Sequence, residues 1–189
     1  MLTVPNLISL ARLACVPVFL WLLFGPDPPH RAAAAYLLGA LGATDWVDGF
    51  IARRFHQVST LGKVLDPMAD RILLGVGIVA IMIDGAVPVW LGTVVIIREV
   101  LVSLAVVALA AAGARRIDVQ WVGKAGTFAL MVSFPLLLAG YHDAVFWHTP
   151  ARFFGWVCAV PGLILSWYAA ARYVPLARRA LKEGRAPAG

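Results

Sequence analysis

The sequence is short of charged residues, which make up only 14% of its 189 positions. A soluble domain usually carries about 25% charged residues and roughly 45–50% apolar ones. Here 61% of the residues are hydrophobic. This composition excludes an ordinary soluble domain and predicts a chain that lies largely within a lipid bilayer.

Cysteine is also scarce, with Cys15 and Cys158 as the two copies. Both lie inside apolar segments, and their spacing is typical of neither a zinc site nor a disulfide framework. We interpret them as small buried hydrophobic side chains.

Acidic residues are fewer than basic ones, ten against sixteen, so the formal net charge is +6. A chain that binds nucleic acid gathers its positive charge on a solvated face, whereas here the charge falls in short breaks between apolar runs. This pattern favours the anionic surface of a cytoplasmic leaflet, and we expect no nucleic-acid partner.

Six apolar runs approach the roughly 20 residues that a helix needs to cross a bilayer. We therefore predict an all-α integral membrane protein with six transmembrane helices, at about 6–24, 32–52, 69–87, 89–112, 125–141 and 153–174. Gly and Pro punctuate the breaks, most clearly at 84–88. The prediction is one membrane domain over 1–178, followed by a basic cytoplasmic tail over 179–189. Because Arg12 lies within the first run, we expect a retained helix there and not a secretory signal.

The basic residues are distributed unequally between the breaks. Those on one predicted side are Arg53, Arg54, Lys63, Arg115, Arg116, Lys124, Arg172, Arg178, Arg179, Lys182 and Arg185, against Arg31 and Arg152 on the other. Positive loops favour the cytoplasm. The sequence therefore predicts that both termini are cytoplasmic and that the protein lies in the cell membrane.

Four carboxylates lie near the cytoplasmic ends of the second and third runs. Asp45 and Asp48 are three residues apart and Asp66 and Asp70 are four apart, so each pair shares one face of a helix. A loop of about ten residues would let the two helices lie antiparallel, which brings the four side chains together. Charges within membrane segments cost a few kcal/mol each, so this cluster requires an explanation.

Divalent cations explain the cluster, because hard oxygen ligands suit Mg²⁺ or Mn²⁺. Two such ions clamp a diphosphate and stabilise its leaving oxygen. Gly49 and Gly62 would let a nucleotide approach the backbone, and Arg53 could bind a phosphate in a bidentate fashion. The alternative is a network of Asp–Arg pairs that stabilises the bundle. We expect an active site that faces the cytoplasm.

The segment 45–70 resembles the signature of CDP-alcohol phosphotransferases. The positions that match it, with the family's gaps between them, are Asp45, Asp48, Gly49, Ala52, Arg53, Gly62, Asp66 and Asp70. The six-span layout is also similar to that of the family, so the resemblance covers nearly the whole chain.

The resemblance implies a reaction in which the phosphatidyl group of CDP-diacylglycerol passes to an alcohol and CMP is released. It implies that Asp45, Asp48, Asp66 and Asp70 bind two metal ions and that Asp70 is also the general base. The residues implied to contact the CDP moiety are Asn6, Gly49, Arg53, Ser59 and Gly62. A homodimer is implied as well.

The acceptor alcohol is predicted to be recognised by the second half of the chain. Arg98 lies within the fourth run, where a charged side chain should face the bundle interior. Together with Lys124 it could bind the acceptor phosphate. The alternative is that Arg98 and Glu99 form a pair that holds helices together.

The segment 98–127 resembles the matching region of glycerophosphate phosphatidyltransferases, but it has Val106 and Gly126 where those enzymes typically carry Arg and Lys. Fewer cations favour an acceptor with one phosphate charge and two acyl chains. We therefore favour phosphatidylglycerol, with cardiolipin as the product, over glycerol 3-phosphate.

Outside enzymes, the competing hypothesis is a cation carrier, because intramembrane carboxylates also mark ion pathways. The fixed positions of Gly49 and Arg53 argue against it.

Overall fold

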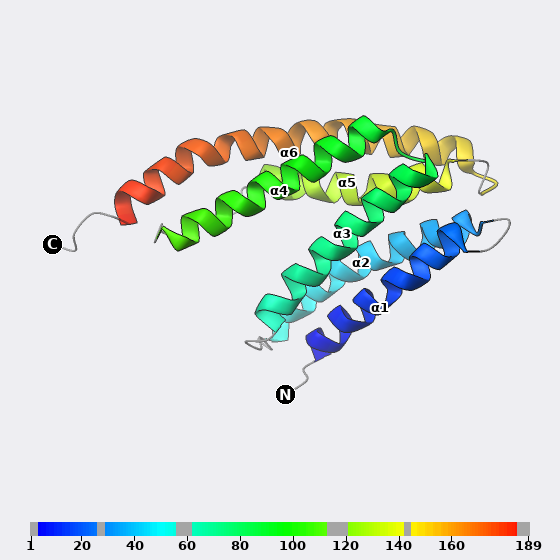
Figure 1. Cartoon of the computed structure of the whole chain (residues 1–189), viewed down its shortest axis with the longest axis horizontal. Helices are drawn as coiled ribbons and strands as arrows, with labels where there is room; N and C mark the ends of the chain where they lie inside the picture. The colour runs from blue at the N-terminus through cyan, green and yellow to red at the C-terminus, as the bar shows by residue number, and fades with distance from the viewer. Residues whose placement is uncertain (1–3, 26–28, 56–61, 113–120, 142–144, 185–189) are drawn as a thin grey trace.

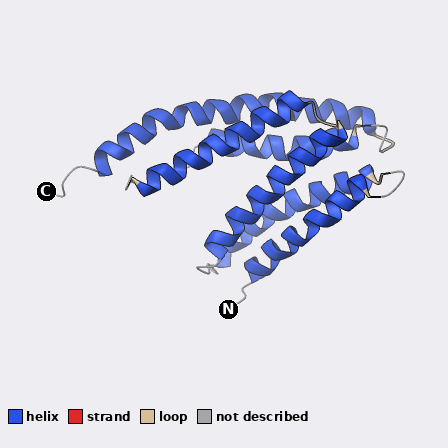
Figure 2. Cartoon of the chain, in the orientation of Figure 1, coloured by secondary structure: helices blue, strands red, loops and turns tan. Residues whose placement is uncertain are grey.

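The computed structural model describes residues 4–25, 29–55, 62–112, 121–141 and 145–184. All regular secondary structure within these ranges is α-helical, which confirms the all-α prediction for this part of the chain (Figure 2). The helices of the described residues are α1 (Val4–Phe24), α2 (Arg31–Phe55), α3 (Gly62–Asp84), α4 (Val89–Ala111), α5 (Trp121–Ala139) and α6 (His148–Gly184).

The observed helix bounds agree best with the predicted ones where Gly and Pro residues separate two helices. Between α3 and α4, Gly85 has a φ of 88°, a left-handed conformation that glycine adopts without steric cost. The larger differences concern α3, which begins at Gly62 and not at 69, and α6, which continues to Gly184 and not to 174. Both extensions contain charged residues. Hydropathy does not detect them, because it indicates which residues suit the membrane interior and not where a helix ends.

Three helices are long and apolar enough to cross a membrane, in the part of the chain that the structure describes: Val89–Leu109, Trp121–Ala139 and His148–Tyr173. Leu10–Phe24 is a shorter apolar helix. α2 and α3 carry the charged signature near one end. The chain therefore has the helices of a membrane protein, while six spans remain a prediction.

The helices form two groups, α1–α3 and α4–α6, and successive helices run in opposite directions (Figure 1). α1 packs against both α2 and α3. In the other group α5 and α6 make the most extensive contact of the described chain, and α2 packs against α5 to join the groups. The beginning of α1, the end of α2 and the beginning of α3 consequently lie at one end of the molecule (Figure 1).

α5 and α6 approach closely at Gly126. A Cβ atom added to Gly126 would lie 2.7 Å from the backbone nitrogen of Ser166 and 3.0 Å from the carbonyl oxygen of Gly162. Small residues let helix backbones approach in this way in membrane proteins. Because the neighbouring atoms belong to the backbone of α6, they cannot move aside as a flexible side chain would.

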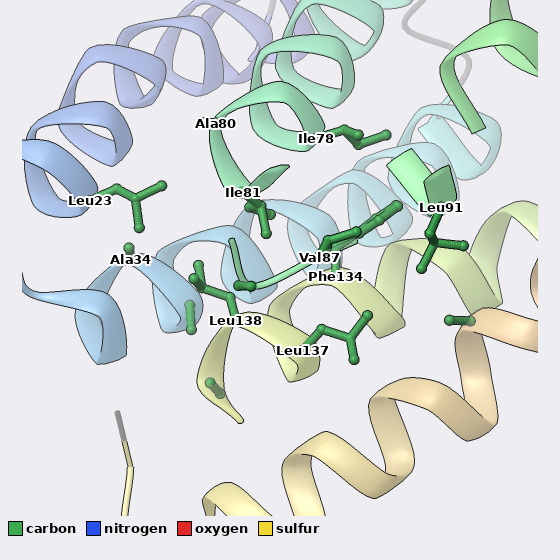
Figure 3. Packing of buried hydrophobic residues seen from close by; sticks show 14 of the residues in the cluster. Leu23, Ala34, Ile78, Ala80, Ile81, Val87, Leu91, Phe134, Leu137 and Leu138 are labelled. Atoms are coloured by element: carbon green, nitrogen blue, oxygen red, sulfur yellow. The ribbon is translucent and has the colours of Figure 1, made fainter. Parts of the chain in front are cut away.

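The buried hydrophobic cluster lies at the end of the bundle opposite the signature, as far as described side chains are concerned. Its members come from the end of α1, the beginning of α2, the end of α3, the beginning of α4, the second half of α5, the beginning of α6 and the connections before α4 and α6. Those labelled in Figure 3 are Leu23, Ala34, Ile78, Ala80, Ile81, Val87, Leu91, Phe134, Leu137 and Leu138. This packing fixes the relative positions of the helices at one end of the molecule.

An ion pair reinforces the same end. The Arg31 Nε donates to Asp84 Oδ1 at 2.9 Å, and Arg31 Nη2 lies 2.8 Å from the same oxygen. The Asp84 side chain is only 2% exposed. The pair therefore joins the beginning of α2 to the end of α3 with a nearly buried carboxylate.

Candidate functional site

The signature residues lie on two helices whose ends meet at the same end of the molecule. Asp45 and Asp48 are in the C-terminal half of α2, and Asp66 and Asp70 are near the beginning of α3. Both pairs therefore lie toward the neighbouring ends of α2 and α3, which Figure 1 shows at one end of the molecule. Their side chains lie outside the described part of the structure, so convergence of the four carboxylates stays a prediction.

The predicted nucleotide contacts are distributed over the same helix ends. Asn6 is near the beginning of α1, Gly49 and Arg53 are near the end of α2, and Gly62 is the first residue of α3. Ser59 lies outside the described residues, as do the side chains of Asn6 and Arg53. What the backbone supports is a common location for these residues, next to the aspartates.

The predicted metal ligands are likewise untested by side-chain geometry. Among the residues whose side chains are described, no group of three or more His, Cys, Asp or Glu could hold a metal ion. The four aspartates are not part of that set. The donor atoms that they offer are carboxylate oxygens, which are the ligands that Mg²⁺ and Mn²⁺ prefer.

A cavity of about 280 Å³ lies between α1, α2, α3, α4 and α5. Most of its wall is apolar: Leu38, Leu41, Gly42, Leu73, Leu74, Gly77, Ile78, Ile81, Met131 and Phe134. Pockets that bind small molecules typically combine such walls with a few placed polar groups. Gly42 is three residues from Asp45, so one side of this cavity adjoins the signature.

Four polar side chains complete the wall, namely Arg12, Arg71, Glu99 and Thr127, each from a different helix. Arg71 directly follows Asp70 in α3 and is exposed, whereas Arg12 is buried at 4% exposure. The polar groups therefore face the signature half of the bundle, and the apolar wall extends toward the opposite end.

Arg71 connects α3 to α4. Its Nη1 contacts the Oγ of Ser103, and the Ser103 Oγ also donates to the backbone oxygen of Glu99 at 2.5 Å. The turn of α3 that carries Asp70 is thereby fastened to the turn of α4 that carries Glu99. Sequence reasoning missed Arg71 and Ser103, although the adjacency of Arg71 to Asp70 was a signal that could have indicated the first.

Arg98 and Glu99 contact each other, and Arg98 also reaches α6. The Arg98 side chain is buried, its Nη1 contacts Oε1 of Glu99, and its Nε donates to the backbone oxygen of Ser166 at 3.4 Å. The contact predicted by the helix-pairing alternative is therefore present and reaches α6. Lys124 is exposed on α5. Binding of the acceptor by Arg98 and Lys124 stays a prediction.

A family profile and several proteins of known name match most of this chain. The profile of the CDP-alcohol phosphatidyltransferase family matches residues 2–169. A cardiolipin synthase (CMP-forming) of Streptomyces coelicolor is 40% identical over 185 residues, which covers 96% of this chain and 85% of that protein. The CDP-diacylglycerol–glycerol-3-phosphate 3-phosphatidyltransferase of Bacillus subtilis is 32% identical, over 73% of this chain and 77% of that protein. The enzyme of the same name from Escherichia coli K12 is 34% identical, over 71% of this chain and 76% of that protein.

Proposed function

Since the chain belongs to the CDP-alcohol phosphatidyltransferase family of enzymes, we propose that it transfers the phosphatidyl group of CDP-diacylglycerol to an alcohol that contains glycerol, with release of CMP. The observation that carries this proposal is the complete signature between Asp45 and Asp70, on helices α2 and α3 whose ends lie together. A reaction that needs two groups of carboxylates in one place is compatible with this arrangement.

The chemistry assigns one proton transfer to this chain. Asp70 takes the proton of the acceptor hydroxyl, whose oxygen then forms a bond to the phosphorus that bears diacylglycerol. The bond between that phosphorus and the bridging oxygen of the diphosphate breaks, and CMP leaves with the electron pair. Arg53 would bind the leaving phosphate, and Asn6, Gly49, Ser59 and Gly62 would position the cytidine nucleotide.

Asp45, Asp48, Asp66 and Asp70 would hold two Mg²⁺ or Mn²⁺ ions. When bound, such ions neutralise the diphosphate and polarise its phosphorus. Four carboxylates at one end of a membrane bundle repel one another without counter-charge, which supports this assignment.

Phosphatidylglycerol is the favoured acceptor, and glycerol 3-phosphate is the alternative. Gly126 supports this choice, because its position is too crowded for the lysine that glycerophosphate enzymes typically carry there: an added Cβ would lie 2.7 Å from the Ser166 backbone nitrogen. Val106, at the other expected cation position, is exposed and apolar. The similarity to a protein named cardiolipin synthase at 40% identity agrees with this choice.

The proposal includes the topology of the protein. Six spans, both termini in the cytoplasm and an active site at the cytoplasmic face would place the signature where a soluble nucleotide can leave. α1 begins and α6 ends on the same side of the molecule, which supports termini on one side of the membrane (Figure 1). A homodimer in the cell membrane is part of the same proposal.

The test is an acceptor screen with the purified protein in detergent. Radiolabelled CDP-diacylglycerol and Mn²⁺ or Mg²⁺ are incubated with phosphatidylglycerol, with glycerol 3-phosphate, or with neither, and the lipid products are separated. We expect cardiolipin with the first acceptor. Phosphatidylglycerophosphate would identify the alternative, and absence of CMP release with every alcohol would favour a cation carrier.

Asp70→Asn tests the assignment of the general base. We expect turnover to fall by at least about 10²-fold, because general base catalysis contributes typically 10²–10⁴-fold, while binding of CDP-diacylglycerol remains measurable. The measurement pairs initial rates of CMP release with equilibrium binding of the labelled lipid. Turnover at the wild-type rate would remove Asp70 from this role.

A further inference from the structure

The Glu99 side chain has a position that the reaction described above does not use. It lines the cavity from α4, and it is only partly accessible, with 28% of the side chain exposed. An ionised carboxylate in a mostly apolar cavity is costly unless it is paired or hydrogen-bonded. The Glu99 carboxylate therefore needs a charged or hydrogen-bonding partner, and its presence in the cavity needs a functional explanation.

Arg98 supplies the partner. It reaches Glu99 Oε1 through Nη1 and is itself anchored by its Nε to the Ser166 backbone oxygen on α6. Arg98 does not line the cavity, whereas Glu99 does. Arg98 therefore contacts one oxygen of a carboxylate that lines the cavity, and the carboxylate keeps further lone pairs that can accept a hydrogen bond from a ligand.

The turn of α4 that carries Glu99 is also held against the signature. Arg71, one residue after Asp70, contacts Ser103 Oγ, and Ser103 donates to the Glu99 backbone oxygen at 2.5 Å. Arg71 and Glu99 both line the cavity. Asp70 precedes Leu73 and Leu74 by three and four residues, so it shares the face of α3 that lines the cavity. Under the proposed function, the acceptor that gives its proton to Asp70 would lie next to this wall.

We propose that Glu99 accepts a hydrogen bond from the second hydroxyl of the acceptor's glycerol group, with Arg98 as the positioning residue that holds Glu99 in place. This inference rests on the proposed function and deepens it. Phosphatidylglycerol and glycerol 3-phosphate both carry two adjacent hydroxyls, one to attack and one to be recognised. A carboxylate is an acceptor only, so it suits a hydroxyl and would repel a phosphate.

The test compares acceptors that differ by this one hydroxyl. Phosphatidylglycerol is compared with phosphatidyl-1,3-propanediol, and glycerol 3-phosphate with 3-hydroxypropyl phosphate, at saturating CDP-diacylglycerol. A hydrogen bond to a charged group is worth about 1.5–3 kcal/mol, or roughly 10- to 150-fold. We expect the wild type to prefer the diol by about that factor in kcat/KM.

Glu99→Ala should lower kcat/KM for the diol by the same factor, leave KM for CDP-diacylglycerol unchanged, and make the two acceptors nearly equivalent. Glu99→Gln retains an acceptor oxygen without charge, so its preference should fall between those of the wild type and Glu99→Ala. Arg98→Lys should reduce the preference, and adding Glu99→Ala to it should have little further effect. Val100→Ala, at an exposed neighbouring position on α4, should keep the wild-type preference.

Three results would overturn the inference in distinguishable ways. A wild-type preference retained in Glu99→Ala, which means a loss of kcat/KM that is equal for both acceptors, would exclude the hydrogen bond. If Glu99→Ala does not fold, an unchanged preference in Glu99→Gln decides against it. A wild type that makes no lipid product from any of these acceptors would refute the proposed function itself, and the inference with it.

Discussion

Replacement of Gly126 by alanine tests the close approach of α5 and α6. The new Cβ would lie 2.7 Å from the backbone nitrogen of Ser166, 3.0 Å from the oxygen of Gly162 and 3.1 Å from the carbonyl carbon of Leu165. Overpacking typically costs about 1–3 kcal/mol, and contact with backbone favours the upper value. Alanine returns about 1 kcal/mol through its better helix propensity, so we expect a net loss of about 2 kcal/mol.

The assay is thermal unfolding of the purified protein in detergent. For a chain of this size, about 2 kcal/mol corresponds to a Tm lowered by roughly 4–8 °C. Gly75→Ala is the matched control, because a Cβ at Gly75 has nothing within 4 Å. That variant should gain about 1 kcal/mol and melt slightly above the wild type.

A Gly126→Ala protein that melts at or above the wild-type temperature would refute this account of the interface. Gly126→Lys extends the same reasoning to specificity. It would add the cation that glycerophosphate enzymes typically carry, but through the same crowded Cβ. We therefore expect lower stability and no gain in the use of glycerol 3-phosphate, measured by product analysis.

Other predictions concern the two ends of the bundle. Arg31→Ala leaves the nearly buried Asp84 carboxylate without its partner, so the free energy of unfolding measured in detergent should fall by about 3 kcal/mol. Replacing both residues by leucine should restore most of that stability. Gly85→Ala places a side chain at a φ of 88°, 2.7 Å from the Tyr141 hydroxyl, and should destabilise by at least about 1–2 kcal/mol; a wild-type Tm would contradict this. EDTA should abolish CMP release, and Mn²⁺ or Mg²⁺ should restore it; full activity after chelation would argue against the metal assignment.

The sequence predicted helices well where physical signals are local. α4 was expected at 89–112 and lies at Val89–Ala111, because Gly85 and Pro88 end one helix and begin the next. The apolar run that predicts α3 begins only at 69, because the first turns of α3 are charged, whereas the four-residue spacing of Asp66 and Asp70 indicated a helix there. The six helices of the described residues therefore follow from local chemistry.

The candidate site was predictable only in part. The spacing of three and four residues identified the aspartates as two pairs on helix faces, because such spacing can be read directly from the sequence. The contact of Arg98 with α6 was not predictable, because it depends on the rotation of α4 relative to α6. Arg98 contacts Ser166, which lies 68 positions away in the chain. The cavity was not predictable for the same reason, since its wall combines residues from α1 to α5.

The location of the buried cluster has a mechanical consequence. Among the described side chains, the helices pack together at the end that contains Leu23, Ile81 and Leu138, while the signature occupies the opposite ends of α2 and α3. A helix of 23 residues is about 35 Å long, so a rotation of about 5° at the buried cluster displaces its far end by about 3 Å. A substitution that changed the packing of the cluster by that angle would therefore shift the backbone of the signature on α3, although the two lie far apart along the helix.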